Sequence, residues 1–314
     1  MTLKKTLKII LPLILGGFLV WYSLSKVSIE TLLKYFQNAN YWWIALGLIF
    51  GILSHLSRAY RWKYLLEPMG YKPDFGNSTM AVLVAYLVNY AVPRAGEVSR
   101  AAVMTNYEDI PFEKGFGTIV AERIADLLMM LLIICITLFV QFDFIYELLT
   151  KNFSIEKIAI IVAALVVGFF IFSRYVKKAT KGIGLKIKNF ISGLIEGATS
   201  IFKMKNKWAF IFHTVFIWAM YVAMFWATVP AIENLSVPFG AVLIGFIAGG
   251  FSIAATNGGI GLYPIAVAGA FALFNIPEEP ANAFGWIMWT AQTVMIIVFG
   301  GLAFVLLPIY NKNK

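Results

Sequence analysis

Long runs of apolar residues, separated by short polar stretches, dominate this chain. The apolar stretches lie near residues 7–24, 41–57, 79–92, 117–142, 157–173, 208–230, 238–256, 264–275 and 283–308. Several of them reach or approach the roughly 20 residues that an α-helix needs to cross the hydrocarbon core of a bilayer. The pattern therefore predicts an all-α polytopic membrane protein.

The lysines and arginines of the short loops orient these helices, because cytoplasmic loops carry an excess of both residues. Basic residues near both ends place the N- and C-termini in the cytoplasm, and the basic connection 174–207 is placed there as well. The N-terminus lacks a small-residue cleavage site, so we expect a retained first helix instead of a signal peptide. Apolar residues between 183 and 194 recur at helical spacing among lysines, which predicts an amphipathic surface helix.

Two apolar segments, 79–92 and 264–275, are too short to cross the membrane as helices. As a helix, 79–92 would reach only about 21 Å, against a hydrocarbon core of roughly 30 Å. The loop charges then favour a re-entrant hairpin that enters from the cytoplasm and turns at Val92-Pro93-Arg94. The segments 238–256 and 264–275 predict a second hairpin from the outer side, although two full crossings satisfy the same parity.

The expected architecture is one flippase-like transmembrane domain over residues 1–314. It has about six full transmembrane helices plus two re-entrant helical hairpins, or eight spans. An inverted pair, of the kind that transporters use, is one way to relate the two hairpins.

Composition and charge exclude several classes of function. The chain is 60% hydrophobic and 13% charged, and its net charge of +10 concentrates in loops beside apolar segments. This distribution suits membrane topology and anionic lipid headgroups, so we expect no nucleic-acid partner. Cys135 is the single cysteine, and His55 and His213 lie on separate predicted helices. We therefore expect no internal disulfide, no metal centre and no cofactor.

The run NYAVPRAGEVSR, residues 89–100, places charges beside a helix break. Pro93 removes a backbone donor and disfavours helix before it, so a new half-helix begins there with a partial positive charge at its N-terminus. Arg94 and Arg100 add full charges, a combination that suits a lipid phosphate. Gly96 allows a headgroup or a neighbouring helix to approach the backbone. Glu97 either pairs with the arginines at rest or binds an amine.

A second break lies in TNGGIGLYP. Asn257, Gly258, Gly259 and Gly261 permit a tight turn, and Pro264 is placed as the first residue of the following helix. A second positive helix end would then face the same cavity. The alternative is that proline and glycine only kink transmembrane helices; for the two motifs together we favour a ligand cavity.

The run AERIADLL places Glu122, Arg123 and Asp126 on a predicted membrane helix. Charges inside such a helix are costly and mark interior or functional positions. We expect a salt-bridge network with Arg94 or Arg100. The alternative is that these side chains extend toward the cytoplasmic interface.

Further basic and aromatic residues end the stretch 41–57. We interpret Arg58, Arg61 and Lys63 as topology signals and phosphate-level anchors, with a headgroup-binding role for Arg61 given equal weight. Trp62 and Tyr64 are typical of an aromatic belt.

Four motifs occur in a fixed order: RxxRW at 58–62, NxxxPRxGExxR at 89–100, ERxxD at 122–126 and GGxG at 258–261. With them the chain resembles the transmembrane, flippase-like domain of lysylphosphatidylglycerol synthases and the stand-alone proteins of that family. The resemblance covers nearly all of the chain. It implies a translocase that moves lysyl-phosphatidylglycerol or other polar lipids between leaflets.

The resemblance also has departures. A proline often precedes GGxG in the family and a glutamate follows it by three, whereas here Asn257 and Pro264 stand in those places. A second intramembrane carboxylate is therefore missing, which weakens any lysyl-specific or proton-relay mechanism. The soluble synthase domain is not expected, so this chain should not make aminoacyl lipids by itself.

We therefore predict a lipid translocase for polar or anionic headgroups in the plasma (inner) membrane of a bacterium. Its partners would be membrane phospholipids, with a homo-oligomer or a separate lipid-modifying enzyme as further possibilities. No GxxxxGK[ST] loop is present, so ATP hydrolysis is not expected. The alternatives are a membrane-embedded lipid-linked transferase, with Glu97, Glu122 or Asp126 as a base, and a non-catalytic scaffold. The predicted headgroup-binding residues are Arg61, Asn89, Arg94, Gly96, Glu97, Arg100, Glu122, Arg123, Asp126, Asn257, Gly258, Gly259 and Gly261.

Overall fold

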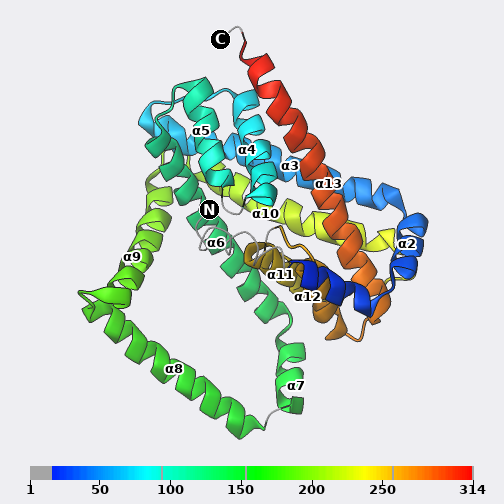
Figure 1. The fold of residues 1–314 in the computed structure, drawn as a ribbon. Helices are drawn as coiled ribbons and strands as arrows, with labels where there is room; N and C mark the ends of the chain where they lie inside the picture. The colour runs from blue at the N-terminus through cyan, green and yellow to red at the C-terminus, as the bar shows by residue number, and fades with distance from the viewer. Residues whose placement is uncertain (1–15, 93–94, 153, 257, 313–314) are drawn as a thin grey trace, which may run out of the picture. The chain divides into compact units, whose positions relative to one another are not determined.

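The computed structural model describes residues 16–92, 95–152, 154–256 and 258–312, and every regular element in them is a helix (Figure 1). Residues 16–26 are helical. The elements that follow are α2 (Ile29–Asn38), α3 (Tyr41–Leu66), η1 (Glu67–Met69), α4 (Phe75–Ala91), α5 (Gly96–Glu108), α6 (Phe112–Val140), α7 (Phe142–Asn152), α8 (Ile155–Lys178), α9 (Gly182–Lys203), α10 (Lys207–Thr228), η2 (Val229–Ala231), α11 (Phe239–Ala255), α12 (Leu262–Ala272) and α13 (Glu278–Tyr310).

Four helices in the described residues are long and apolar enough to cross a membrane. They are α3 with η1, α6, α10 with η2, and α13. The predicted span 157–173 lies within α8. The all-helical membrane class is confirmed, while the number of crossings and the sides of the termini stay predictions.

The chain divides into two compact units. The first contains residues 1–122 and 208–314, and the second contains residues 123–207. The second unit consists of the later part of α6, followed by α7, α8 and α9. Helix α9 covers the segment for which the lysine-rich pattern predicts a surface helix.

Both predicted hairpins are present in the first unit. Helices α4 and α5 pack against each other, as do α11 and α12. The chain leaves the helical conformation at Val92 and α5 begins at Gly96. Helix α12 begins at Leu262, so Pro264 is its third residue and not its first, as the sequence predicted. A hairpin can dip into a membrane or cross it twice, so re-entry stays a prediction.

Close packing joins α3 to α10, which run in opposite directions. Near the start of α3, the amide of Asn40 donates to the carbonyl of Ala231 over 2.8 Å. Further along, a Cβ on Gly47 would lie 2.5 Å from Thr228 Oγ1, and one on Gly51 would lie 2.9 Å from Met224 Sδ. Two glycines four positions apart let helices approach closely, as in the small-residue contacts of membrane helices.

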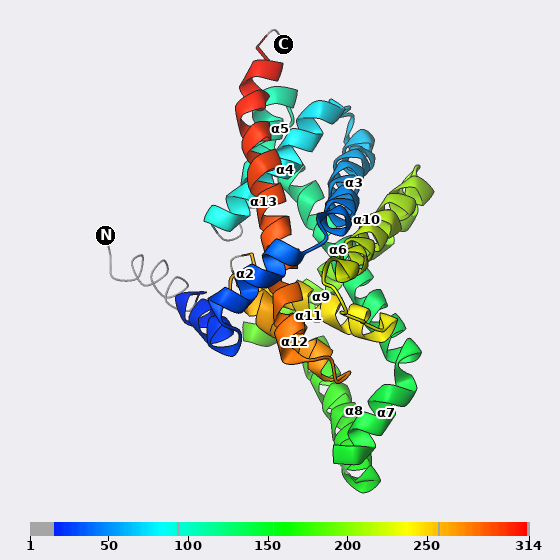
Figure 2. The same ribbon diagram turned by 90° about the vertical axis from the view of Figure 1, so that its right-hand side faces the viewer.

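The largely aliphatic core of the first unit contains a group of packed aromatic rings. The rings of Phe225, Phe271 and Phe284, from α10, α12 and α13, lie with their centroids 5.0 to 6.2 Å apart. Helix α13 also runs along α4, as Figure 2 shows. Long apolar helices thus hold both hairpins in place.

Candidate functional site

The last turns of α3 carry three large side chains on one face. Arg58, Arg61 and Trp62 are three and four positions apart, and each is at most 2% exposed. The full burial of Trp62 contradicts its predicted place in an aromatic belt, while the headgroup-binding role weighed for Arg61 stays a prediction. Helix α3 continues to Leu66, and this face packs against other parts of the protein.

Three guanidinium groups meet at one carboxylate, that of Glu122 in the first half of α6. Arg58 Nη1 donates to Glu122 Oε1 over 2.5 Å, and Arg61 Nη2 lies 3.2 Å from the same oxygen. Arg100, from α5, places Nη1 3.1 Å from Oε1 and Nη2 3.1 Å from Oε2. The planar guanidinium matches both oxygens of a carboxylate or a phosphate, which lysine does not. We call these four residues the arginine cluster.

Neighbouring side chains fix the arginines in place. The Arg100 guanidinium lies 3.8 Å from the ring centroid of Trp62, within the range of a cation–π contact. Trp62 Nε1 donates to Thr118 Oγ1 over 2.8 Å, and Arg61 Nη1 donates to Thr214 Oγ1 over 2.8 Å. The cluster is therefore a preorganised group of donors, with its rotamers set by packing.

A row of hydroxyl groups extends from the cluster. Arg58 Nη2 lies 3.5 Å from the Tyr221 hydroxyl, which lies 3.1 Å from the Tyr86 hydroxyl. The buried ring of His55 lies 4.5 Å from that of Tyr86, and its two nitrogens have no hydrogen-bond partner among the described residues. Sequence reasoning missed His55 as a candidate, because a lone histidine in an apolar helix carries no motif.

The electrostatic balance of this region is positive. The guanidinium groups of the cluster outnumber its carboxylate three to one. Glu97, half-buried and three residues before Arg100 on α5, adds a second carboxylate. The three arginines and two glutamates together leave an excess of one positive charge. A buried site with more arginines than carboxylates has the charge that favours an anion.

The predicted salt-bridge network is confirmed for Glu122 and Arg100. Arg94, the other predicted partner, lies outside the described residues. Arg123 and Asp126 belong to the second unit, where Arg123 Nη1 lies 3.5 Å from Asp126 Oδ2 and the Arg123 side chain is 43% exposed.

Asn89 and Gly96 hold the first hairpin together. Asn89 Oδ1, on α4, accepts from the Gly96 amide over 2.8 Å and so caps the first turn of α5. A Cβ on Gly96 would collide with the Ala85 carbonyl and the Asn89 side chain. Of the two roles that the sequence allows for Gly96, the structure shows the close approach of a neighbouring helix.

The break between α11 and α12 adjoins the first hairpin. Gly258, Gly259 and Gly261 all have positive φ, between 64° and 82°. A Cβ on Gly258 would lie 2.7 Å from the ring of Tyr90, in the last turn of α4. The two breaks therefore lie beside each other, as a shared cavity would require. Asn257 lies outside the described residues.

Comparison with known proteins places this geometry in context. The family described as "Lysylphosphatidylglycerol synthase TM region" matches residues 9–301. A UPF0104 membrane protein of Methanocaldococcus jannaschii is 23% identical over 98% of this chain and 97% of its own length. Glycosyltransferase AglD of Haloferax volcanii is 31% identical over 86 residues, which are 27% of this chain and 14% of that protein.

Proposed function

We propose a lipid translocase, from the premise that this integral membrane protein belongs to the lysylphosphatidylglycerol synthase TM region family. It moves a lipid with a polar or anionic headgroup between leaflets while the acyl chains remain in the bilayer. The sequence-based prediction places it in the plasma membrane of a bacterium. Family membership gives the membrane domain, and the substrate is argued from the site.

One observation carries the proposal: three buried guanidinium groups converge on the single carboxylate of Glu122. A phosphate offers the same planar pairs of oxygens as a carboxylate and carries charge of the same sign. The arginine cluster is thus already arranged for an anionic headgroup. Glu122 then acts as the resting counter-ion, and Glu97, on the same helix as Arg100, lies in the first turn of α5.

The burial of the cluster indicates how binding and transport are linked. Each side chain in it is at most 3% exposed, so a headgroup reaches the arginines only when the helices around them separate. The phosphate would compensate for the ion pairs that Glu122 gives up as they separate. A ligand that binds the open state more tightly shifts the population toward it, which is what a translocase requires.

Arg100→Ala tests this proposal in proteoliposomes. The substitution removes the guanidinium that lies against both Glu122 oxygens but leaves Arg58 and Arg61 in place. Loss of one charge-assisted contact to a phosphate should slow exchange of headgroup-labelled phosphatidylglycerol by about tenfold to a hundredfold. Exchange between leaflets is followed by quenching of the label from outside.

Arg123→Ala is the matched control, since it removes an arginine one residue from Glu122 on the same helix. It should leave exchange within about twofold, because the Arg123 side chain is 43% exposed and its contact with Asp126 is long, at 3.5 Å. Thermal unfolding in detergent verifies that both variants are folded. Wild-type exchange that is unchanged in Arg100→Ala would refute the role of the cluster.

A lipid-linked transferase is the second candidate, favoured by the partial match to a protein named as a glycosyltransferase. The arginines would then hold the phosphate of a lipid-linked donor, and Glu97 or Glu122 would act as the base. Purified protein that forms a new lipid product from such a donor and an acceptor would favour this function over translocation.

A further inference from the structure

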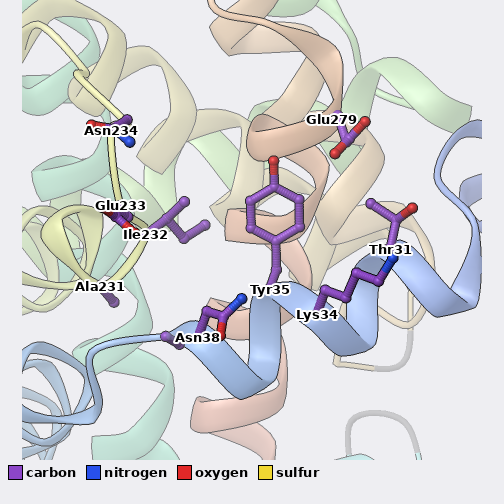
Figure 3. A pocket seen from close by; sticks show the side chains of 10 residues that line it. Thr31, Lys34, Tyr35, Asn38, Ala231, Ile232, Glu233, Asn234 and Glu279 are labelled. Atoms are coloured by element: carbon purple, nitrogen blue, oxygen red, sulfur yellow. The ribbon is translucent and has the colours of Figure 1, made fainter.

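A second polar site lies in the first unit, away from the arginine cluster. An open surface pocket of about 300 Å³ is bounded by α2, the end of η2 with the residues after it, and the start of α13. This volume is at the small end of the range for ligand pockets. The polar side chains that line it are Thr31, Lys34, Tyr35, Asn38, Glu233, Asn234 and Glu279 (Figure 3). We call this site the α2 pocket.

The α2 pocket and the arginine cluster lie at opposite ends of the α3–α10 pair. Ala231, which lines the pocket, accepts the hydrogen bond from Asn40 directly before α3. Arg61 lies 20 residues after Tyr41, which corresponds to roughly 30 Å along the helix. That separation equals the thickness of a bilayer's hydrocarbon core. The loop charges predict the cytoplasmic side for the cluster and hence the outer side for the pocket.

The chemistry of the pocket differs from that of the cluster. The lining contains two carboxylates, Glu233 and Glu279, and one cation, Lys34, which lies 3.9 Å from Glu30. The surplus of negative charge disfavours a phosphate, and the lysine disfavours a small cation. Amide and hydroxyl groups supply both donors and acceptors around the same space.

Tyr35 is central to the pocket. Its hydroxyl points toward Glu279 (Figure 3). Burial and the adjacent Glu279 carboxylate raise the pKa of Tyr35, so its phenol keeps its proton at neutral pH. The ring provides an apolar face beside a polar rim, the combination that a sugar or polyol ring with its hydroxyl groups requires.

We propose that the α2 pocket binds an uncharged, hydroxyl-rich group, such as the glycosyl or glycerol portion of a lipid headgroup. Each hydroxyl both donates and accepts, which matches the mixture of carboxylates, amides, Tyr35 and Lys34. In transport, the pocket would receive or release the headgroup at the end opposite the arginine cluster. This role rests on the proposed function. The binding itself depends only on the pocket residues.

Binding of glucosylglycerol to the purified full-length protein in detergent tests the proposal, with saturation-transfer NMR as the readout. We expect saturable binding in the millimolar range, weakened about tenfold in Glu279→Gln, which corresponds to about 1.4 kcal/mol. Glu278→Gln is the matched control, because Glu278 neighbours Glu279 but pairs with Lys26 at 3.6 Å and does not line the pocket. Asn38→Ala is a second pocket variant, which tests the site if Glu279→Gln does not fold.

The outcomes separate the pocket from the transport function. Binding that persists in Arg100→Ala but falls in Glu279→Gln or Asn38→Ala supports the pocket, even if the translocase proposal fails. Absence of glucosylglycerol binding to folded wild-type protein overturns it. Tighter binding of glycerol phosphate or ethanolamine, weakened in the same variants, also overturns it, because the pocket would then select charge.

Discussion

At the scale of single residues, the most consequential contact is that of Glu122 with three arginines. Its side chain is fully buried, and it forms ion pairs with Arg58 and Arg61 of α3 and Arg100 of α5. The pairs hold α3, α5 and α6 together through electrostatics as well as packing. A change of one unit of charge at Glu122 therefore affects the contacts of three helices.

Glu122→Gln should strongly destabilise the protein. The substitution keeps the size of the side chain but leaves three guanidinium groups without the carboxylate, and loss of one partner of a buried ion pair costs about 3–5 kcal/mol. Asp126→Asn, one turn later, should cost less than about 1 kcal/mol, since its partner Arg123 is partly exposed. Thermal unfolding in detergent checks both, and equal shifts would contradict the central role of Glu122.

Added phosphatidylglycerol should raise the unfolding temperature of Glu122→Gln more than that of the wild type. The arginines no longer have a resting counter-ion, so an anionic headgroup binds them without competition. A purely structural cluster would show the same lipid effect in both proteins.

At the scale of helices, the packing of α3 on α10 sets the frame on which both polar sites are built. The contact depends on Gly47 and Gly51, whose missing side chains leave room for Thr228 and Met224 of α10. Glycines are common in apolar segments, so the sequence alone does not mark Gly47 or Gly51. Their importance follows from their contact with α10. The close packing of α3 on α10 therefore depends on the absence of side chains at these two positions.

Gly47→Ala should separate the two helices and destabilise the protein by about 1–3 kcal/mol, the usual cost of overpacking. The added Cβ would lie 2.5 Å from Thr228 Oγ1 and 3.1 Å from the Met224 carbonyl oxygen. Gly301→Ala on α13 is the control, because nothing lies within 4 Å of its Cβ position. Its unfolding temperature should stay equal or rise with helix propensity. A drop as large as that of Gly47→Ala would contradict the packing argument.

The helices also show what the sequence could and could not predict. Long apolar runs and the breaks at Pro93 and Gly258–Gly261 are local signals, and they located the membrane helices and both hairpins. Helices α2 and α7 were missed because each is short and carries polar residues. The burial of Arg58, Arg61 and Trp62 was not predicted, because charge ended the apolar run at residue 57, while the helix continues to Leu66. Their burial depends on Glu122, more than 60 residues away, which no local pattern reveals.

At the scale of the whole molecule, the first unit contains two polar sites of opposite character. A surplus of positive charge marks the arginine cluster, and a surplus of negative charge marks the α2 pocket. A lipid whose headgroup joins a phosphate to a hydroxyl-rich group has one portion suited to each site. Selectivity would then come from two sites that each recognise one portion of the headgroup, in turn, instead of from a single tight pocket.

The fixed length of the α3–α10 pair has a consequence for stoichiometry. Backbone contact at one end and an arginine–threonine bond at the other keep the two sites roughly 30 Å apart. No single headgroup spans that distance, so each chain has room for two lipids at once. Native mass spectrometry of the wild type with an anionic glycolipid should show up to two retained molecules per chain. Arg100→Ala and Glu279→Gln should each retain one. Transport would then be an exchange of lipid between two sites that are occupied at the same time.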